Sequence, residues 1–256
     1  LEKCTSSRDA AGFDSAVQAY FGTKPLPASI HVHPELPVFL LSKVFSLRES
    51  EDTDKMSASS SLHLSIDLWP KNTCTWLIQL GHLCVSNIGV ALRRSFKPRI
   101  LPPLPTGSFV QALIDSDPSL RRLNQVLQGP VLMDPDELAY VLKTLLSMAR
   151  SCSAVSDETP KALTDSEHQN TNTAQRSSTS NSQTTLASIY RGLNTALQTL
   201  HTHPASAIIK SLRSALSKQD LISIVHHLRL SLATGGYTSR FTEDPPTPIS
   251  PHQTKP

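Results

Sequence analysis

The chain has 256 residues, of which 38% are hydrophobic and 18% are charged, and its formal net charge at pH 7 is +3. A domain usually takes roughly 100 to 200 residues, so this length allows one domain or two small ones with a modest core. The small net charge excludes binding of nucleic acid through overall charge alone, so any such function must depend on local clusters of basic residues.

The first seventy residues carry weak patterns. Helices are expected at 10–21, ending at Gly22, and at 38–47, with prolines between them that favour an extended linker. We therefore expect residues 1–71 to form a weakly ordered N-terminal segment with short helices, a linker and one candidate strand. Because the chain begins at Leu1 without a methionine or a leader, we also expect it to be a piece of a longer polypeptide.

The candidate strand covers residues 62–68, where apolar and polar side chains alternate. No second strand pattern stands out in the sequence. Its partner could lie in a part of the protein outside this chain, or the segment could be an edge strand or extended chain packed on helices.

Residues 72–150 have the pattern of a helical region. Apolar residues from Trp76 to Ile88 recur at spacings of three and four, which predicts one helix that ends near Lys97. The uncharged run at 72–92 is long enough to span a bilayer, but its polar residues and two glycines favour a buried helix in a water-soluble domain.

Three further helix starts are expected within the same region. Ser108 with Gln111 has the pattern of a capping box, and an Asp-Pro pair at 117–118 and another at 134–135 each place a cap before a first-turn proline. The third of these helices should bury a stripe of apolar residues, namely Leu138, Val141, Leu142, Leu145 and Met148.

Two segments are too polar or too rich in proline to bury themselves. Between Thr164 and Thr185 the only hydrophobic residue is Ala174. We expect residues 151–185 to be a disordered tether rich in Ser, Thr, Asn and Gln, and residues 242–256 to be a disordered Pro-rich tail.

Residues 186–241 are expected to form a basic helical region that packs with 72–150. Helices are predicted at 186–201, 205–216 and 219–234, and Ser217 with Asp220 should cap the last one. This region has six Lys or Arg residues against one carboxylate, which favours an acidic partner, either protein or RNA. The apolar stripe of the last helix is the candidate interface for a partner helix, and it consists of Leu221, Val225, Leu228 and Leu232.

Basic residues in two places are candidates for contacts with RNA or with an acidic partner. The first group surrounds Phe96, and a basic cluster around an aromatic ring can stack on and neutralise single-stranded RNA. Cations at the end of a helix also stabilise the helix dipole, so a structural reading stays open. The candidate residues in both groups are Arg93, Arg94, Lys97, Arg99, Lys210, Arg213, Arg229 and Arg240.

Motifs of catalytic chemistry are missing from the sequence. The chain has no glycine-rich phosphate loop, no His-Glu-x-x-His pair and no Gly-x-Ser-x-Gly turn. We therefore expect no enzymatic activity, no catalytic, metal-binding or cofactor-binding residues, and no cofactor. The four cysteines lie far apart in the sequence, which favours free thiols in a reducing compartment. The predicted fold is all-α, an array of short amphipathic helices with one extended strand at most in the N-terminal third.

Two stretches resemble a known family. The first runs from Leu104 to Ile114 and continues through Asp117-Pro118-Ser119-Leu120 to Gln128-Gly129-Pro130, and the second joins Leu228-Arg229-Leu230 to the segment 235–241. They resemble the C-terminal region of the fungal U-three snoRNA-associated protein number eight, a subunit of the UTP-A (t-UTP) assembly of the small-subunit processome. The similarity covers about residues 98–244, with the tether as an insertion.

The resemblance implies a non-enzymatic scaffold subunit in the nucleolus, within the nucleus. Such a subunit joins other UTP-A proteins on the 5′ external transcribed spacer of pre-rRNA and supports pre-18S rRNA transcription and processing. The implied partners are the other UTP-A subunits and pre-rRNA, bound directly or within the complex, with no membrane and no small-molecule substrate. In that family a β-propeller precedes the helical region, which packs against equivalent regions of partner subunits. The alternatives are a helical module that binds RNA or tRNA directly, or the helical C-terminal region of another UTP-A subunit.

Overall fold

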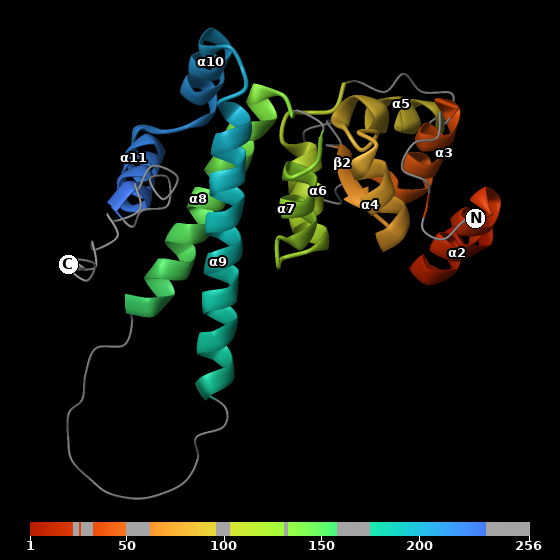
Figure 1. Cartoon of the computed structure of the whole chain (residues 1–256), viewed down its shortest axis with the longest axis horizontal. Coiled ribbons are helices and arrows are strands. Elements are labelled where there is room, and N and C mark those ends of the chain that lie inside the picture. Colours follow the sequence, from red (N-terminus) through yellow and green to blue (C-terminus); the bar gives the residue numbers. More distant parts are fainter. Residues whose placement is uncertain are drawn as a thin grey trace, which may run out of the picture. The chain divides into compact units, whose positions relative to one another are not determined.

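The structure is a computed structural model, and it describes residues 1–22, 26, 33–49, 62–95, 103–130, 133–157 and 175–233. This described part contains eleven helices and a two-stranded antiparallel sheet, which confirms the predicted helical fold class (Figure 1). The chain divides into two compact units, Leu1–Ala215 and Leu216–Pro256.

The first unit holds ten helices and both strands of the described residues. They are α1 (Glu2–Ser6), α2 (Ala10–Phe21), α3 (Glu35–Val44), β1 (Phe45–Glu49), β2 (Leu62–Ile66), α4 (Lys71–Gln79), α5 (Val85–Ser95), α6 (Ser108–Ser116), α7 (Arg121–Leu127), α8 (Pro135–Asp157), α9 (Gln175–Leu200) and α10 (Ala205–Ala215). The second unit holds α11 (Lys218–Ala233).

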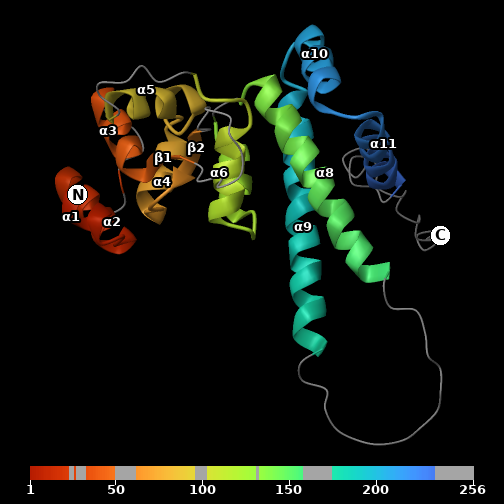
Figure 2. The same cartoon turned by 180° about the vertical axis from the view of Figure 1, so that it is seen from behind.

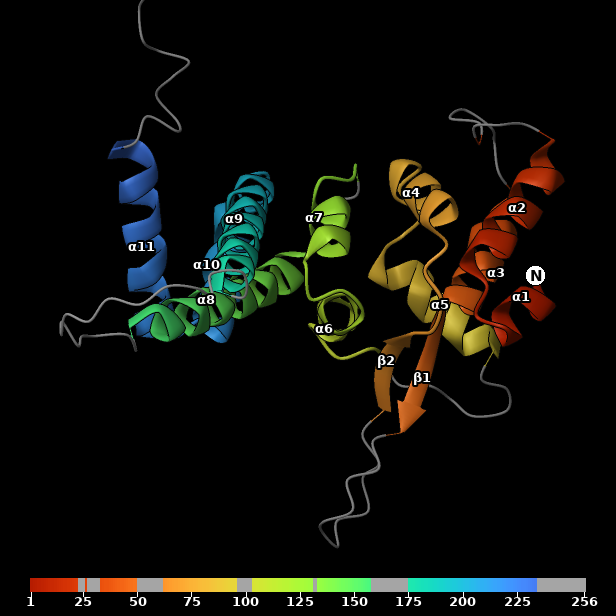
Figure 3. The same ribbon diagram turned by 90° about the horizontal axis from the view of Figure 1, so that it is seen from below.

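The described part of the N-terminal segment is packed, which differs from the weak order expected for residues 1–71. Helix α2 has the predicted bounds, because Asp9 accepts a hydrogen bond from the Gly12 amide at its start and Gly22 ends it at φ 66°. Phe13 and Leu41 are fully buried, and α3 packs against α5 while α2 packs against α4 (Figure 3). The partners of these short helices lie more than forty residues away in the sequence, so local patterns gave no sign of the packing.

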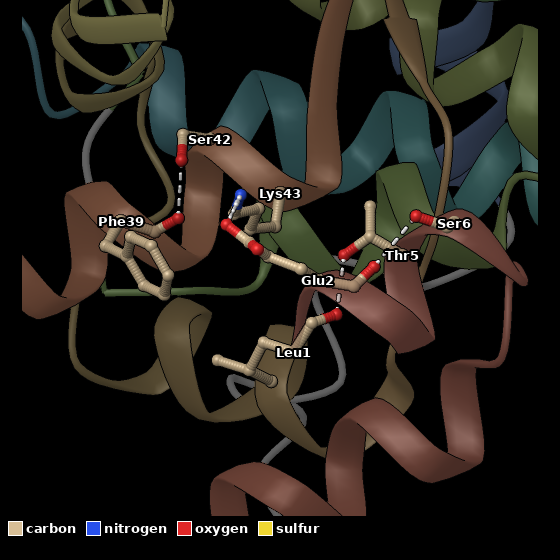
Figure 4. Close-up of polar contacts among 7 residues, drawn as sticks. All are labelled: Leu1, Glu2, Thr5, Ser6, Phe39, Ser42 and Lys43. Atoms are coloured by element: carbon tan, nitrogen blue, oxygen red, sulfur yellow. Dashed lines mark hydrogen bonds and ion pairs between the residues drawn. The ribbon is translucent and has the colours of Figure 1, made fainter.

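An exposed ion pair joins the first helix to the third. The Glu2 carboxylate lies 3.5 Å from the Lys43 ammonium, and the Lys43 ammonium also lies 5.4 Å from the centre of the Phe39 ring (Figure 4). Because the Glu2 side chain is 86% exposed, solvent screens this pair and its contribution to stability is small.

The candidate strand is confirmed as β2, and its partner is β1 of the same chain. The two strands pair antiparallel with Phe45 opposite Ile66 and Leu47 opposite Leu64. The helix expected at 38–47 is therefore wrong at both ends, since α3 begins at Glu35 and gives way to the strand after Val44. The reason is that residues 45–48 alternate apolar and polar side chains, which lets Phe45 bury its ring on one face of the sheet.

The single helix expected from Thr73 to about Lys97 is two helices, α4 and α5. The chain turns at Gly81, whose φ of 77° is left-handed, and the Asn87 side chain donates a hydrogen bond to the His82 carbonyl in the turn. Trp76 in α4 and Ile88 in α5 are both buried, so the helical spacing of apolar residues continues across the turn. The turn therefore cannot be recognised from periodicity. Among the described helices, none is long and apolar enough to cross a membrane.

The predicted helix starts have mixed outcomes. Pro135 is the first residue of α8, as predicted. The capping box of Ser108 and Gln111 is wrong, because Gly107 is the N-cap of α6 and no side chain of its own turn caps it. The start expected at Pro118 is also wrong: α7 begins three residues later, and Asp117 instead accepts hydrogen bonds from the backbone amides of Ser119 and Arg122.

Helices α8 and α9 lie side by side, and α7 and α10 pack on the same pair (Figures 1 and 2). The predicted α8 stripe is buried from Leu138 to Leu145, and Met148 at its end is half-buried. Across the interface, Ile189 and Leu193 of α9 are buried as well. Helices α9 and α10 of the basic region thus pack with the preceding helices as expected.

The tether has different bounds from those predicted. Helix α8 continues to Asp157 and α9 begins at Gln175, so both ends of the predicted tether at 151–185 are helical. Once a helix is nucleated, each added residue contributes a further hydrogen bond, which lets polar residues extend a helix that the core already holds. Residues 158–174 and the tail from 234 lie outside the described residues.

Helix α4 is capped by a carboxylate from another helix. Its N-cap is Pro70, which has no side chain to accept a hydrogen bond. The buried Asp14 carboxylate of α2 accepts hydrogen bonds from the Asn72 amide at 3.0 Å, the Thr73 amide at 2.8 Å and the Thr73 hydroxyl at 2.6 Å. This contact bridges 58 residues of sequence and ties the N-terminal segment to the helical region.

We expect Asp14→Ala to lower the free energy of unfolding by about 2–4 kcal/mol, because three donors at the start of α4 would lose their acceptor in a buried site. Asp14→Asn keeps one oxygen and should cost less. Urea denaturation followed by circular dichroism measures both. Asp115→Ala, at an exposed position on α6, is the matched control and should change stability by less than about 0.5 kcal/mol. Equal stability of the Asp14 and Asp115 variants would contradict the role of this cap.

Candidate partner-binding surface

Helix α10 presents two of the predicted basic residues together. It follows Pro204, whose carbonyl accepts hydrogen bonds from the amides of Ala207 and Ile208, so the helix begins where the sequence predicted. On its inner side Ser211 is buried and its hydroxyl donates a hydrogen bond to the Asp136 carboxylate of α8. This contact fixes which side of α10 faces outward.

The outward side forms a basic surface, which we call the α10 face. It consists of Ser206, Ile209, Lys210, Arg213 and Ser214, which together line an open depression. Ile209 is 49% exposed, and the side chains of Lys210 and Arg213 are exposed as well. In the described part of the chain neither cation forms an ion pair. Two unneutralised charges beside an exposed apolar side chain suit an acidic partner.

The basic cluster after α5 is only partly described. Arg93 is exposed on the last turn of α5, and Arg94 forms an ion pair with Glu35 of α3 at 3.6 Å. Phe96, Lys97 and Arg99 lie outside the described residues. Arg94 therefore has an ion-pair partner within the chain, and the assignment of Arg93 and Arg94 to a contact with a partner molecule stays a prediction.

In the second unit, α11 begins with the predicted capping box. The Ser217 amide and hydroxyl both donate to the Asp220 carboxylate, and the Asp220 amide donates back to the Ser217 hydroxyl at 3.2 Å. Arg229 is exposed on this helix, and Arg240 lies outside the described residues. Sequence therefore predicted both the start of α11 and its cap.

Most of the predicted apolar stripe of α11 is open to solvent. Of the four stripe residues, Leu228 is half-buried and the other three are exposed, while the neighbouring Ile224 is buried. Five large apolar side chains of α11 are between 39% and 61% exposed, namely Leu221, Ile222, Val225, Leu230 and Leu232. Three of them, Leu221, Val225 and Leu232, share one side of the helix at spacings of four and seven residues, and an exposed apolar stripe of this kind is suited to packing against a partner. The interface assigned to this stripe stays a prediction.

A group of acidic residues at the start of α8 was read from the sequence only as helix capping. Glu137 is 5% exposed, and its Oε1 atom accepts a hydrogen bond of 2.8 Å from the Gly107 amide at the start of α6. Its Oε2 atom is buried without a hydrogen-bond partner. Asp134 and Asp136 are exposed beside it. The three carboxylates within residues 134–137 are the sequence signal that could have indicated an acidic site here. The cavity beside them is formed by four separate segments, so it could not be recognised from the sequence.

The environment of Glu137 disfavours its charged form. Burial raises the pKa of the Glu137 carboxyl above its ordinary value of 4.5, the hydrogen bond from Gly107 acts in the opposite direction, and the charges of Asp134 and Asp136 raise this pKa further. The folded state therefore holds the Glu137 proton more tightly than the unfolded state does. Stability from this group is present at low pH and is lost as the pH rises from 4.5 through the raised pKa.

Glu137→Gln should make the unfolding free energy less dependent on pH. The variant keeps an oxygen for the Gly107 amide but carries no charge, so its stability relative to the parent should increase as the pH rises from 4 to 7. Urea denaturation at several pH values across this range measures the difference. Parallel pH profiles for the two proteins would contradict the assignment of the raised pKa to Glu137.

Gly107 is held at a close approach between α6 and α8. Its φ is 84°, and a Cβ atom at this position would lie 2.6–2.7 Å from ring atoms of Tyr140. Glycine is the residue that fits both the left-handed backbone and the contact with the ring. This position belongs to the Leu104–Ile114 stretch, so that part of the sequence is explained by packing.

Gly107→Ala should destabilise the chain by several kcal/mol, because it adds a steric clash to the cost of a left-handed backbone. Gly22→Ala is the matched control, since Gly22 is also left-handed but a Cβ atom added there would meet no other atom within 4 Å. The control should cost only about 1 kcal/mol. Thermal denaturation measures both variants, and equal losses would show that the Tyr140 contact contributes nothing.

Arg122 and the cysteines have structural explanations in the described part of the chain. The Arg122 guanidinium lies 5.1 Å from the centre of the Trp69 ring and donates a hydrogen bond to the Ser116 carbonyl. The four cysteines are free thiols, and burial raises the pKa of the Cys74 thiol above its ordinary value. Within the described residues, no group of His, Cys, Asp and Glu side chains is arranged to hold a metal ion.

In comparisons with known proteins, no family model matches the chain, and no curated protein matches it.

Proposed function

We propose that this chain is a non-enzymatic scaffold subunit of a nucleolar pre-rRNA processing assembly of the UTP-A type. Its helices bind other subunits of the assembly, and its basic surfaces face an acidic protein or RNA. In this role it supports the transcription and processing of pre-18S rRNA without catalysing a reaction.

The observation that carries the proposal is the exposed apolar surface of α11. Five large apolar side chains of this 16-residue helix are exposed to solvent. Burial of apolar area stabilises a complex by roughly 25 cal/mol per Å². Covering the exposed apolar side chains of this helix with a partner would therefore contribute favourable binding free energy. A scaffold subunit joined to its neighbours through helices needs such a surface.

The α10 face adds a second kind of contact. Lys210 and Arg213 are exposed and form no ion pair within the described residues, so their charges remain free for a partner. Complementary charge around an apolar contact increases the association rate and excludes partners of the wrong charge. This arrangement supports an acidic protein surface as the partner of α10.

The type of assembly rests on the resemblance of two stretches to the UTP-A subunit. Within the described residues, the first stretch forms the turn before α6, most of α6 and the turns around α7, where Gly107 and Asp117 have the structural roles given above. The chain offers this resemblance and no catalytic motif, so the scaffold role is the function that it supports best.

Affinity purification of the full-length protein, with identification of the proteins and RNA recovered, tests the assembly. The proposal expects the other UTP-A subunits and the 5′ external transcribed spacer of pre-rRNA. Recovery of membrane carriers or metabolic enzymes in their place would overturn it.

A double charge reversal on the α10 face tests the surface. Lys210→Glu with Arg213→Glu should reduce recovery of the protein partner severalfold and leave helix content unchanged, because both positions are exposed. Quantitative co-purification and circular dichroism measure these effects. Lys3→Glu with Lys143→Glu makes the same change in net charge at other exposed positions and should leave recovery unchanged.

Salt dependence separates an RNA partner from a protein partner. If the α10 face contacts phosphates directly, the double variant should bind RNA more weakly, and the slope of log affinity against log salt should fall by roughly one unit per lost contact. That result would favour the alternative of a module that binds RNA directly. Normal behaviour in both assays would show that the α10 face is an ordinary solvated surface.

A further inference from the structure

A cleft of about 370 Å³ lies between the first turn of α8, helix α10, the turn before α6 and the first residue of α5. Its apolar wall includes Val85, Leu104 and Ala207. Asp134, Asp136 and Glu137 contribute three carboxylates to its lining, and Lys210 contributes one ammonium group. All of these residues belong to the first unit.

Glu137 supplies the observation that points to a ligand. The residue is 5% exposed, and its side chain lines both this cleft and a smaller cavity of about 160 Å³ beside Cys84 and Phe109. The Gly107 amide occupies its Oε1 atom, whereas its Oε2 atom is buried with no hydrogen-bond partner. A buried acceptor without a donor costs about 1–3 kcal/mol, and more when it is charged, so a donor in the cleft would be stabilising.

The chain does not neutralise this acidic group itself. Among the described residues, Lys210 forms no ion pair with any of the three carboxylates, although it lines the same cleft. Asp136 accepts a hydrogen bond from the neutral hydroxyl of Ser211. Negative charge therefore predominates in the cleft, where Asp134 and Asp136 are exposed and Glu137 is buried, and this charge attracts a cation.

We propose that this cleft receives an arginine side chain of a partner protein, with its guanidinium group donating to the Glu137 carboxylate and lying between the charges of Asp134 and Asp136. The site adjoins the α10 face, with which it shares Lys210, and its net charge is of the opposite sign. This inference goes beyond the proposed function, because it does not depend on which assembly the chain joins.

The form of the cleft favours arginine over other cations. A guanidinium group is planar and offers several donors at once, which suits adjacent carboxylates, and it is only weakly hydrated and so loses little on entering a partly buried site. The apolar wall can contact the aliphatic stem of the side chain. The described carboxylates do not form a group able to hold a metal ion, which makes an organic cation the better occupant.

Titration with short peptides tests the proposal on the whole chain. The probes are an end-capped Gly-Arg-Gly peptide and the same peptide with citrulline, which has the shape of arginine but no charge. Backbone amide resonances of Gly107, Ala207 and Ser211 report binding by NMR. We expect saturable shifts with the arginine peptide and none with the citrulline peptide, and equal shifts with both would overturn the proposal.

Variants locate the site. Glu137→Gln should weaken binding of the arginine peptide about tenfold or more, because a charge-assisted hydrogen bond is lost. Lys210→Ala should strengthen binding a few-fold by removing the competing positive charge. The control Asp115→Asn removes an exposed carboxylate outside the cleft and should leave binding unchanged. Unchanged affinity in Glu137→Gln, or weaker binding in Lys210→Ala, would overturn the proposal.

The parent protein provides a measurement that needs no variant. Asp134, Asp136, Lys210 and the Cys84 thiol are the titratable groups that line the two cavities beside Glu137. Protonation of the carboxylates removes the charge that attracts arginine, so the affinity should fall as the pH decreases from 7 to 4. Constant affinity over this range would contradict a carboxylate site. Tighter binding of spermidine than of the arginine peptide would identify a free polyamine as the ligand and would overturn the assignment to a protein side chain.

Discussion

Two buried carboxylates complete the starts of helices to which they are not adjacent in sequence. The first turn of every helix leaves backbone amides without partners, and neither Pro70 before α4 nor Gly107 before α6 has a side chain that can accept from them. Asp14 supplies the acceptor for α4 across 58 residues, and Glu137 accepts from the amide of Gly107, the N-cap residue of α6, across 30 residues. The starts of α4 and α6 therefore depend on tertiary packing. The same two contacts connect the N-terminal segment to α4 and connect α8 to α6 within the first unit.

This dependence explains which parts of the fold could be predicted from the sequence. Helices α2, α10 and α11 have local stop or start signals, and their predicted bounds agree with the structure to within about one residue, as does the start of α8. The capping box at Ser108 fails because Gly107, with its amide bound to Glu137, takes the N-cap position. β1 was not predicted because its alternation of apolar and polar residues is only four residues long. So short a pattern indicates a strand only when a partner such as β2 pairs with it.

The candidate surfaces also differ in whether they are set by local sequence or by tertiary packing. Lys210 and Arg213 are three residues apart, so helical geometry alone places them on one side of α10, and the structure does so. The ion pair of Arg94 with Glu35 could not be predicted, because it requires α3 to pack against α5. The acidic cleft could not be predicted either, because its walls come from four segments that are distant in sequence.

Helix α11 differs from the helices of the first unit in how its start is satisfied. Its cap is the local pair Ser217 and Asp220, and no carboxylate from a distant helix is needed. A local cap contributes about 1 kcal/mol, which matters because a helix of sixteen residues in water is marginally stable by itself. The capping box therefore helps to hold the exposed apolar side chains in a helical arrangement in the chain by itself. Pre-ordering of this kind reduces the conformational entropy lost on binding, so a helix with a self-sufficient cap is well suited to serve as an interface.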